Sequence, residues 1–214
     1  MSVRVKICGI RDEAGLEAAC ASGADAVGFV LAPSPRRVSL FEARRLLRLV
    51  PREIERIAVF ARATLRELSA ALELDFDALQ AEAESEWPEL DARRFALPVL
   101  RDGADLERRA LALGRTETRP NSLRGALVLD GSAGGGQGSA VDGARARSLA
   151  ALRPVVLAGG LTPANVAARI RAVRPFAVDV SSGVERLRAQ KDPALVHAFV
   201  RAVRTVAVQA EVGT

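Results

Sequence analysis

Short apolar runs alternate along the whole chain with longer segments whose apolar residues recur at helical spacing. The short runs predict eight strands: Val3–Ile7, Ala26–Leu31, Ile54–Phe60, Phe76–Leu79, Phe95–Leu100, Ala126–Leu129, Val155–Ala158 and Phe176–Val180. The longer segments predict helices: Glu13–Ala21, Phe41–Leu49, Leu65–Leu72, Leu106–Leu113, Ala144–Leu152, Val166–Val173 and Ala194–Val208. The segment Ser85–Arg94 contains Trp87-Pro88 and predicts only a short helical turn or two, because proline is best tolerated in a first turn.

Strands that alternate with helices pair in parallel. Eight such units in 214 residues predict a small (β/α)8 barrel, with residues 1–214 forming one domain. A doubly wound open sheet is the alternative. We favour the barrel because small and polar residues follow four strand ends, which meet at one mouth in a barrel. These are Cys8-Gly9, Asp130-Gly131, Gly159-Gly160 and Ser181-Ser182-Gly183.

The composition, 49% hydrophobic and 27% charged residues, is typical of a globular protein. No apolar run is long enough to span a bilayer and the N-terminus does not resemble a signal peptide, so we expect a cytoplasmic protein without a membrane partner. A net charge of +5 favours anionic ligands. Because the arginines are scattered on helical faces with few aromatic residues, we expect no nucleic-acid partner. The sequence leaves open whether the protein is a monomer or a homodimer.

Cysteine and histidine are too scarce to form a metal centre. Cys8, Cys20 and His197 are the only residues of these two types, so we expect neither a disulfide framework nor a bound metal. Cys20 lies among alanines in a predicted helix, where packing is the expected role. His197 lies in the last predicted helix, away from every strand end.

Cys8 and Asp130 follow the first and sixth predicted strands. A thiolate can remove a proton from carbon and a carboxylic acid can protonate a departing ring oxygen, so the pair can act as general base and general acid. Cys8 would first have to ionise, because an ordinary thiol has a pKa near 8.5. The alternatives are a small buried hydrophobic residue for Cys8 and a turn or helix cap for Asp130.

Two glycine-containing turns follow the seventh and eighth strands. The first contains Gly159 and Gly160, and the second runs through Asp179, Ser181, Ser182 and Gly183. Glycine lets backbone N–H groups approach an anion closely, and the corresponding loops bind phosphate in many barrels. Although tight turns need glycine in any case, the two together predict a phosphorylated small-molecule substrate.

Arg36 and Arg37 follow a proline-stiffened loop after the second strand. A guanidinium there can bind a carboxylate through two hydrogen bonds or stack on an aromatic ring. The alternative is a solvated surface pair.

Four motifs spread over the chain carry a family resemblance: KICGI at residues 6–10, GADAVGFV at 23–30, LAGGLTPANV at 157–166 and RPFAVDVSSGVE at 174–185. Their order and spacing resemble those of the phosphoribosylanthranilate isomerases of tryptophan biosynthesis. The resemblance implies a (β/α)8 barrel that isomerises N-(5-phosphoribosyl)anthranilate by an Amadori rearrangement, without a cofactor.

Carried onto this chain, the resemblance makes Asp130 the acid that opens the ribose ring and Cys8 the base that takes the C2′ proton. Arg37 falls where the family holds the anthranilate. The Gly159-Gly160 and Ser182-Gly183 backbone falls where it holds the phosphate.

The chain also departs from the family pattern. The usual Gln-Leu-His-Gly reads Gln80-Ala81-Glu82-Ala83, Pro98 lies near the usual strand-five lysine, and the Pro-Gly after Glu185 is missing. The usual glycine-rich segment beyond Asp130 reads Gly135-Gly136-Gln137-Gly138. Two further hypotheses therefore stay open: a related ribose-phosphate isomerase, and a barrel that has lost catalysis and acts as a phosphate-ligand sensor or assembly partner.

Overall fold

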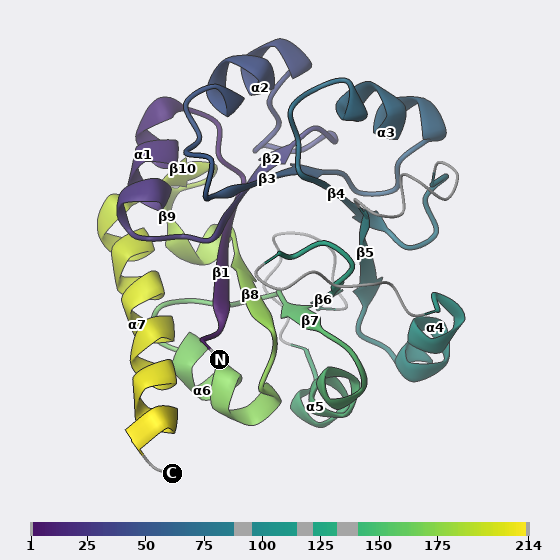
Figure 1. Ribbon diagram of the computed structural model, residues 1–214, viewed down its shortest axis with the longest axis vertical. Helices are drawn as coiled ribbons and strands as arrows, with labels where there is room; N and C mark the ends of the chain where they lie inside the picture. Colours follow the sequence, from purple (N-terminus) through teal and green to yellow (C-terminus); the bar gives the residue numbers. More distant parts are fainter. Residues whose placement is uncertain (1, 88–95, 115–121, 132–140, 213–214) are drawn as a thin grey trace.

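Eight parallel strands form a closed barrel in the computed structural model, which describes residues 2–87, 96–114, 122–131 and 141–212 (Figure 1). The strands are β1 (Arg4–Cys8), β2 (Ala26–Val30), β3 (Glu55–Val59), β4 (Ala78–Glu82), β5 (Ala96–Arg101), β6 (Leu127–Asp130), β7 (Val155–Leu157) and β8 (Ala177–Val180). Closure comes from pairing of β1 with β8, with Lys6 opposite Asp179. The predicted barrel is confirmed, and the open-sheet alternative is wrong.

Helices surround the barrel (Figure 1). They are α1 (Glu13–Ala21), α2 (Leu40–Leu47), α3 (Leu65–Leu72), α4 (Leu106–Ala112), α5 (Gly143–Leu152), α6 (Val166–Val173) and α7 (Pro193–Val212). Side-chain caps determine where several of them begin: Ser39 and Thr64 each form a capping box at the start of α2 and α3. Among the helices of the described residues, none is long and apolar enough to cross a membrane.

Alternation along the strands divides the buried side chains into two layers. One cluster includes Leu97, Val99 and Val128 and fills the barrel interior, whereas Leu79, Leu100 and others face the helices. Polar residues replace the inner apolar ones toward the carboxyl ends of the strands. The polar side chains are therefore concentrated at the mouth of the barrel, where they can contact a ligand.

Two details differ from the predicted elements. β4 continues to Glu82, three residues past its predicted end, so the sequence Gln80–Glu82 lies in the strand and not in a loop after it. A short antiparallel hairpin of β9 (Glu185–Leu187) and β10 (Gln190–Lys191) follows β8 and was not predicted, because its strands are too short to show alternation. Residues 88–95 and 132–140, which include most of the Ser85–Arg94 segment and Gly135–Gly138, lie outside the described residues.

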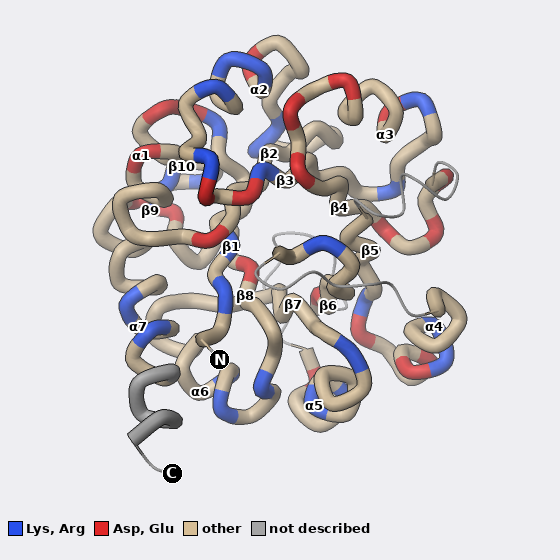
Figure 2. Tube along the Cα trace, viewed as in Figure 1, with Lys and Arg blue, Asp and Glu red and all other residues tan. Residues whose placement is uncertain are grey.

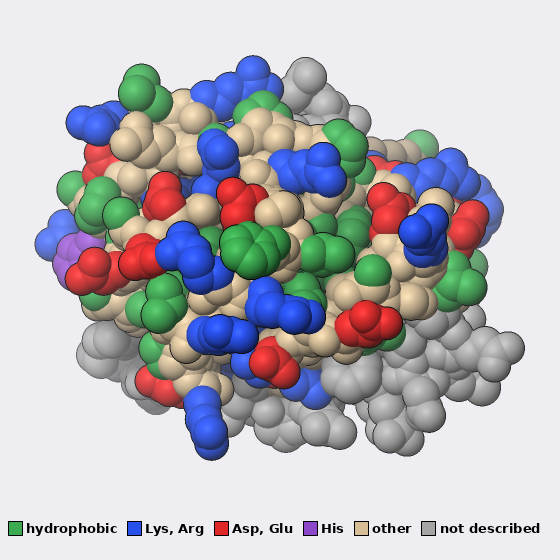
Figure 3. All heavy atoms as spheres, turned by 90° about the horizontal axis from the view of Figure 1, so that it is seen from above, with side chains coloured by type: hydrophobic (Ala, Val, Ile, Leu, Met, Phe, Trp, Pro, Cys, Tyr) green, Lys and Arg blue, Asp and Glu red, His purple; other side chains and the backbone are tan. Residues whose placement is uncertain are grey.

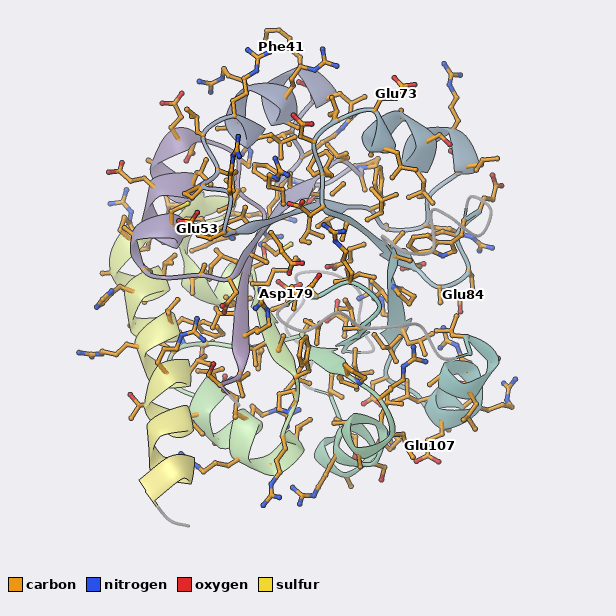
Figure 4. The ribbon with its side chains drawn as sticks, viewed as in Figure 1. Phe41, Glu53, Glu73, Glu84, Glu107 and Asp179 are labelled. Atoms are coloured by element: carbon orange, nitrogen blue, oxygen red, sulfur yellow. The ribbon has the colours of Figure 1, made fainter. Side chains whose placement is uncertain are left out.

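Charged residues are spread around the barrel. Lys and Arg occur on helices on all sides, with Asp and Glu among them (Figure 2). On the face seen in Figure 3, basic, acidic and hydrophobic side chains are intermixed. Phe41 is 81% exposed and projects from α2 away from the barrel (Figure 4). The positive net charge is thus dispersed over the surface.

Candidate active site

A pocket of about 640 Å³ opens at the carboxyl ends of the barrel strands. Its volume is in the range of sites for small molecules. The lining combines the predicted residues Cys8, Asp130, Gly159, Gly160, Asp179, Ser181 and Ser182 with Arg36, Gln80, Glu82 and Arg101. Asp179 lies at the centre of the barrel (Figure 4). The structure therefore brings both predicted catalytic residues and most of the predicted substrate-binding residues to one cavity.

Cys8 is the last residue of β1 and lies beside a buried ion pair. Lys6, two residues earlier on the same face of the strand, is fully buried, and its Nζ donates to Asp179 Oδ2 at 2.8 Å. Lys6 Nζ and the Cys8 sulfur both lie beside Gly28, and the two groups interact electrostatically. The Lys6 ammonium group therefore lies between Cys8, the predicted base, and Asp179, a predicted substrate-binding residue.

Burial sets the protonation state of this cluster. Desolvation raises the pKa of the Cys8 thiol above its ordinary value, and Lys6 only partly opposes this rise. Burial also disfavours the charged form of Lys6, but Asp179 and Cys8 together raise the pKa of this ammonium group. The resting form of Cys8 is therefore the thiol beside a charged lysine.

Asp130 ends β6 and is held on both carboxyl oxygens. Arg101 Nη1 donates to Asp130 Oδ2 at 2.5 Å, and the Gly131 N–H donates to Oδ1 at 2.8 Å. Burial raises the pKa of Asp130, with Asp179 adding to the rise, although Arg101 and the Gly131 amide oppose it. A raised pKa is the direction that general-acid chemistry requires.

The turns after β7 and β8 form a concave backbone surface. Gly159 and Gly160 have φ of +82° and +63°, a left-handed conformation that favours glycine. Their amides donate no hydrogen bond to any described residue, so both are available to an anion. Gly183 is also required, because a Cβ there would lie 1.8 Å from the Leu161 carbonyl oxygen. We call residues 159–160 and 181–183 the anion cradle.

The structure separates the two arginines after β2. Arg36 lines the pocket, whereas Arg37 is exposed and lies outside the lining. Arg36 donates to both carboxylate oxygens of Glu185, from Nε at 2.7 Å and from Nη2 at 2.8 Å. The expectation that Arg37 reaches the substrate therefore needs correction: the turn that places Arg36 inward directs the next side chain outward.

Glu185 connects the hairpin to the mouth of the barrel. Besides Arg36, its carboxylate accepts from Lys191 Nζ at 2.9 Å and from the Ala189 N–H at 3.0 Å. Lys191 Nζ also donates to the Ser181 carbonyl oxygen at 2.9 Å. The network thereby links Arg36 to the anion cradle.

We expect the Glu185 network to make stability depend on acid pH. Burial alone would raise the pKa of Glu185, but Arg36 and Lys191 lower it to about 2. Because the folded-state pKa is depressed, the stabilisation is present above the unfolded pKa near 4.5 and is lost as pH falls toward 2. Glu185→Gln should lower the free energy of unfolding at pH 7 by about 3 kcal/mol, as when one partner of a buried ion pair is removed. Urea denaturation at pH 7 and pH 3 tests this, and an equal loss at both pH values would contradict it.

Gly28 leaves room for the side chains of Cys8 and Lys6. A Cβ at this position would lie 3.0 Å from Cys8 Sγ and 3.1 Å from Lys6 Nζ. We expect Gly28→Ala to displace both groups, to lower turnover about tenfold, and to cost about 1–3 kcal/mol of stability through overpacking. Gly143→Ala is the control, because the one described atom that its Cβ would approach within 4 Å is Arg169 Nη1, at 3.9 Å. Unchanged kinetics in Gly28→Ala would show that Cys8 and Lys6 are not held tightly.

Four residues near the mouth were not predicted from the sequence: Glu82, Arg101, Glu185 and Lys191. Glu82 and Arg101 are the last residues of their strands, so strand-end position is a signal that could have found both. Glu185 and Lys191 offered no such signal, since they reach the site through an unpredicted hairpin. Among the described residues, no three His, Cys, Asp or Glu side chains cluster as metal ligands.

The chain forms a closed (β/α)8 barrel with a carboxyl group, a thiol and the anion cradle at one mouth. These features are typical of barrels that bind a phosphorylated ligand and carry out acid–base chemistry. A family model described as N-(5'phosphoribosyl)anthranilate (PRA) isomerase matches residues 5–202. The chain belongs to this family.

Individual relatives agree with this assignment. The N-(5'-phosphoribosyl)anthranilate isomerase of Chromohalobacter salexigens is 41% identical over 207 residues, covering 94% of this chain and 93% of the relative. The crystal structure of phosphoribosyl anthranilate isomerase from Thermotoga maritima has a TM-score of 0.78 at 34% identity, covering 95% of this chain and 99% of that chain. A crystal structure of a phosphoribosyl anthranilate isomerase in complex with reduced 1-(o-carboxyphenylamino)-1-deoxyribulose 5-phosphate also has a TM-score of 0.78, at 31% identity and with the same coverage.

Proposed function

We propose that this protein converts N-(5-phosphoribosyl)anthranilate to 1-(2-carboxyphenylamino)-1-deoxyribulose 5-phosphate, an Amadori rearrangement in tryptophan biosynthesis. The observation that carries the proposal is that Cys8, Asp130 and all of the anion cradle except Gly183 line one pocket of a chain that belongs to this family. Ring opening and proton transfer require no redox group, so the side chains present supply the chemistry.

Asp130 acts first in the proposed mechanism. It gives its proton to the ribose ring oxygen as the C1′–O bond breaks, and the nitrogen lone pair forms the C1′=N iminium bond. The Asp130 carboxylate that results is stabilised by Arg101 and by the Gly131 amide.

Cys8 acts second. The iminium group acidifies the C2′ hydrogen. Cys8, once its thiol has lost its proton to solvent, removes this hydrogen as the thiolate and leaves an enolamine. Loss of the proton from the C2′ hydroxyl and protonation at C1′ then give the ketose. Lys6 stabilises the thiolate electrostatically, because its positive charge favours the ionised form of the nearby sulfur.

Binding contacts follow from the geometry of the mouth. We place the phosphate on the Gly159-Gly160 and Ser182-Gly183 backbone and the anthranilate carboxylate near Arg36. Asp179 Oδ1 and Gln80 Oε1 are buried acceptors with no partner among the described residues. The hydroxyl groups of the substrate are suitable donors for them, since buried acceptors are normally satisfied. The cytoplasmic location and the choice between monomer and homodimer stay predictions.

A fluorescence assay tests the function. The substrate is generated in situ from anthranilate and phosphoribosyl pyrophosphate, and its loss is followed with purified protein. Rapid loss supports the proposal. Tight binding of the reduced product without turnover would favour the sensor hypothesis, and turnover of an aminoimidazole ribonucleotide alone would favour a related sugar isomerase.

A further inference from the structure

Arg101 lies between two carboxylates at the barrel mouth. Its Nη1 donates to Asp130 Oδ2 at 2.5 Å, and its Nη2 donates to Glu82 Oε1 at 3.3 Å. The strand register explains the arrangement: Arg101 of β5 is the direct partner of Asp130 in β6, and Glu82 of β4 pairs with Val99, two residues before Arg101. All three side chains therefore end β4, β5 and β6 on the inner face of the barrel.

These three side chains line the pocket and do not lie on the outer surface. Glu82, Arg101 and Asp130 all line the cavity, and their side chains are only 21–29% exposed. An ion pair there is screened less by water than a surface pair. The charge on Arg101 consequently acts on Asp130 at close range, and the charge on Glu82 acts on Arg101.

Other charges also face Asp130 from the barrel. Asp179 of β8 disfavours the ionised form of Asp130, and the Gly131 amide of the adjoining turn favours it. From β1, Lys6 and Cys8 lie beside Asp179, and Lys6 compensates part of its charge. Arg101 is thus the cation in direct contact with the Asp130 carboxylate, and Glu82 is the anion that shares it.

We propose that Arg101 and Glu82 are positioning residues for the general acid: Arg101 orients Asp130 and stabilises its carboxylate after proton donation, whereas Glu82 draws part of the guanidinium charge away from it. This inference rests on the proposed function, in which Asp130 donates the proton. The two residues oppose each other. Removing Arg101 should make Asp130 hold its proton more strongly, and neutralising Glu82 should make Asp130 release it more easily.

Titration of Asp130 by 13C NMR of its carboxyl carbon measures this opposition directly. The resonance is assigned by its absence in Asp130→Asn. We expect the midpoint to move to higher pH in Arg101→Met and to lower pH in Glu82→Gln. A structural disturbance shared by the variants would not move it in opposite directions. Shifts of the same sign, or no shift in either variant, would overturn the proposal.

A second arginine–glutamate pair on neighbouring elements provides the matched control. Arg109 of α4 donates to Glu84 at 2.5 Å, and neither residue lines the pocket. Glu84 lies toward α4 at the periphery of the barrel (Figure 4). Arg109→Met and Glu84→Gln should leave the Asp130 titration unchanged. A shift as large as that in the mouth variants would also overturn the proposal. Arg101→Gln also removes the positive charge and tests the same point if Arg101→Met does not fold.

Kinetics separate this inference from the proposed function. For turnover of N-(5-phosphoribosyl)anthranilate, we expect Arg101→Met to lower kcat about tenfold with less than about a twofold change in KM, because the acid is misplaced but binding is retained. An unchanged kcat would overturn the positioning role while leaving the isomerase intact. Absence of turnover in the unsubstituted protein would refute the proposed function, and the NMR titration would still report whether Arg101 and Glu82 act on Asp130.

Discussion

We expect Asp130→Asn to lower kcat for N-(5-phosphoribosyl)anthranilate by about 10³-fold, within the range that general acids contribute. Asparagine preserves the shape of the side chain, and its single amide oxygen can replace one of the two acceptors that Asp130 offers to Arg101 and to the Gly131 N–H. It has no proton acidic enough to transfer to the ribose ring oxygen. The loss should therefore fall on kcat, while the reduced product still binds. The fluorescence assay and a binding titration measure the two quantities.

Asp102→Asn is the matched control for this change. Asp102 directly follows β5 and its carboxylate is also paired with an arginine, Arg145, with Nε to Oδ1 at 2.9 Å. It does not line the pocket. We expect its kcat to stay close to that of the unsubstituted protein. If Asp130→Asn kept more than about a tenth of the original kcat, another group would have to supply the proton.

Cys8→Ala should lower turnover by about 10²- to 10⁴-fold, because the C2′ proton then has no base at the end of β1. Cys8→Ser should be similarly impaired, since a serine hydroxyl ionises far less readily than a thiol. Both replacements are small, so the barrel should keep its fold. The same assay measures turnover, and thermal unfolding verifies the fold.

Cys20→Ala is the control for general effects of removing a thiol. Cys20 lies in α1 and is partly buried against the hydrophobic core. We expect normal turnover in this variant. Undiminished turnover in Cys8→Ala would eliminate Cys8 as the base and would direct attention to Asp179, the other buried acidic group near Lys6.

The sequence could not predict which of the two arginines after β2 enters the pocket. The resemblance assigned the substrate contact to Arg37, but Arg36 enters the pocket and forms two hydrogen bonds with Glu185. Adjacent residues in an irregular loop have no periodicity that distinguishes inside from outside. Their directions depend on local turn contacts, such as the Arg36 N–H donating to Ser34 Oγ and the Arg37 N–H donating to the Ser34 carbonyl oxygen.

The protonation state of Cys8 also could not be predicted from the sequence. The sequence identified the thiol and its strand-end position, but regular alternation alone did not establish that Lys6 reaches it. The structure places Lys6 beside Cys8, yet burial still raises the pKa of the thiol. The balance between a nearby charge and desolvation depends on the surrounding packing, which no local pattern records.

By itself, the sequence determined the alternation of strands and helices, the barrel class, and the strand-end positions of Cys8, Asp130 and the glycine turns. These features follow from short-range patterns: side-chain periodicity, helix caps and backbone conformations that glycine favours. Only the tertiary structure decided the charge pairs that surround the candidate catalytic groups. Lys6 and Asp179 are 173 residues apart and Arg101 and Asp130 are 29 apart, so their contacts depend on barrel closure and strand register.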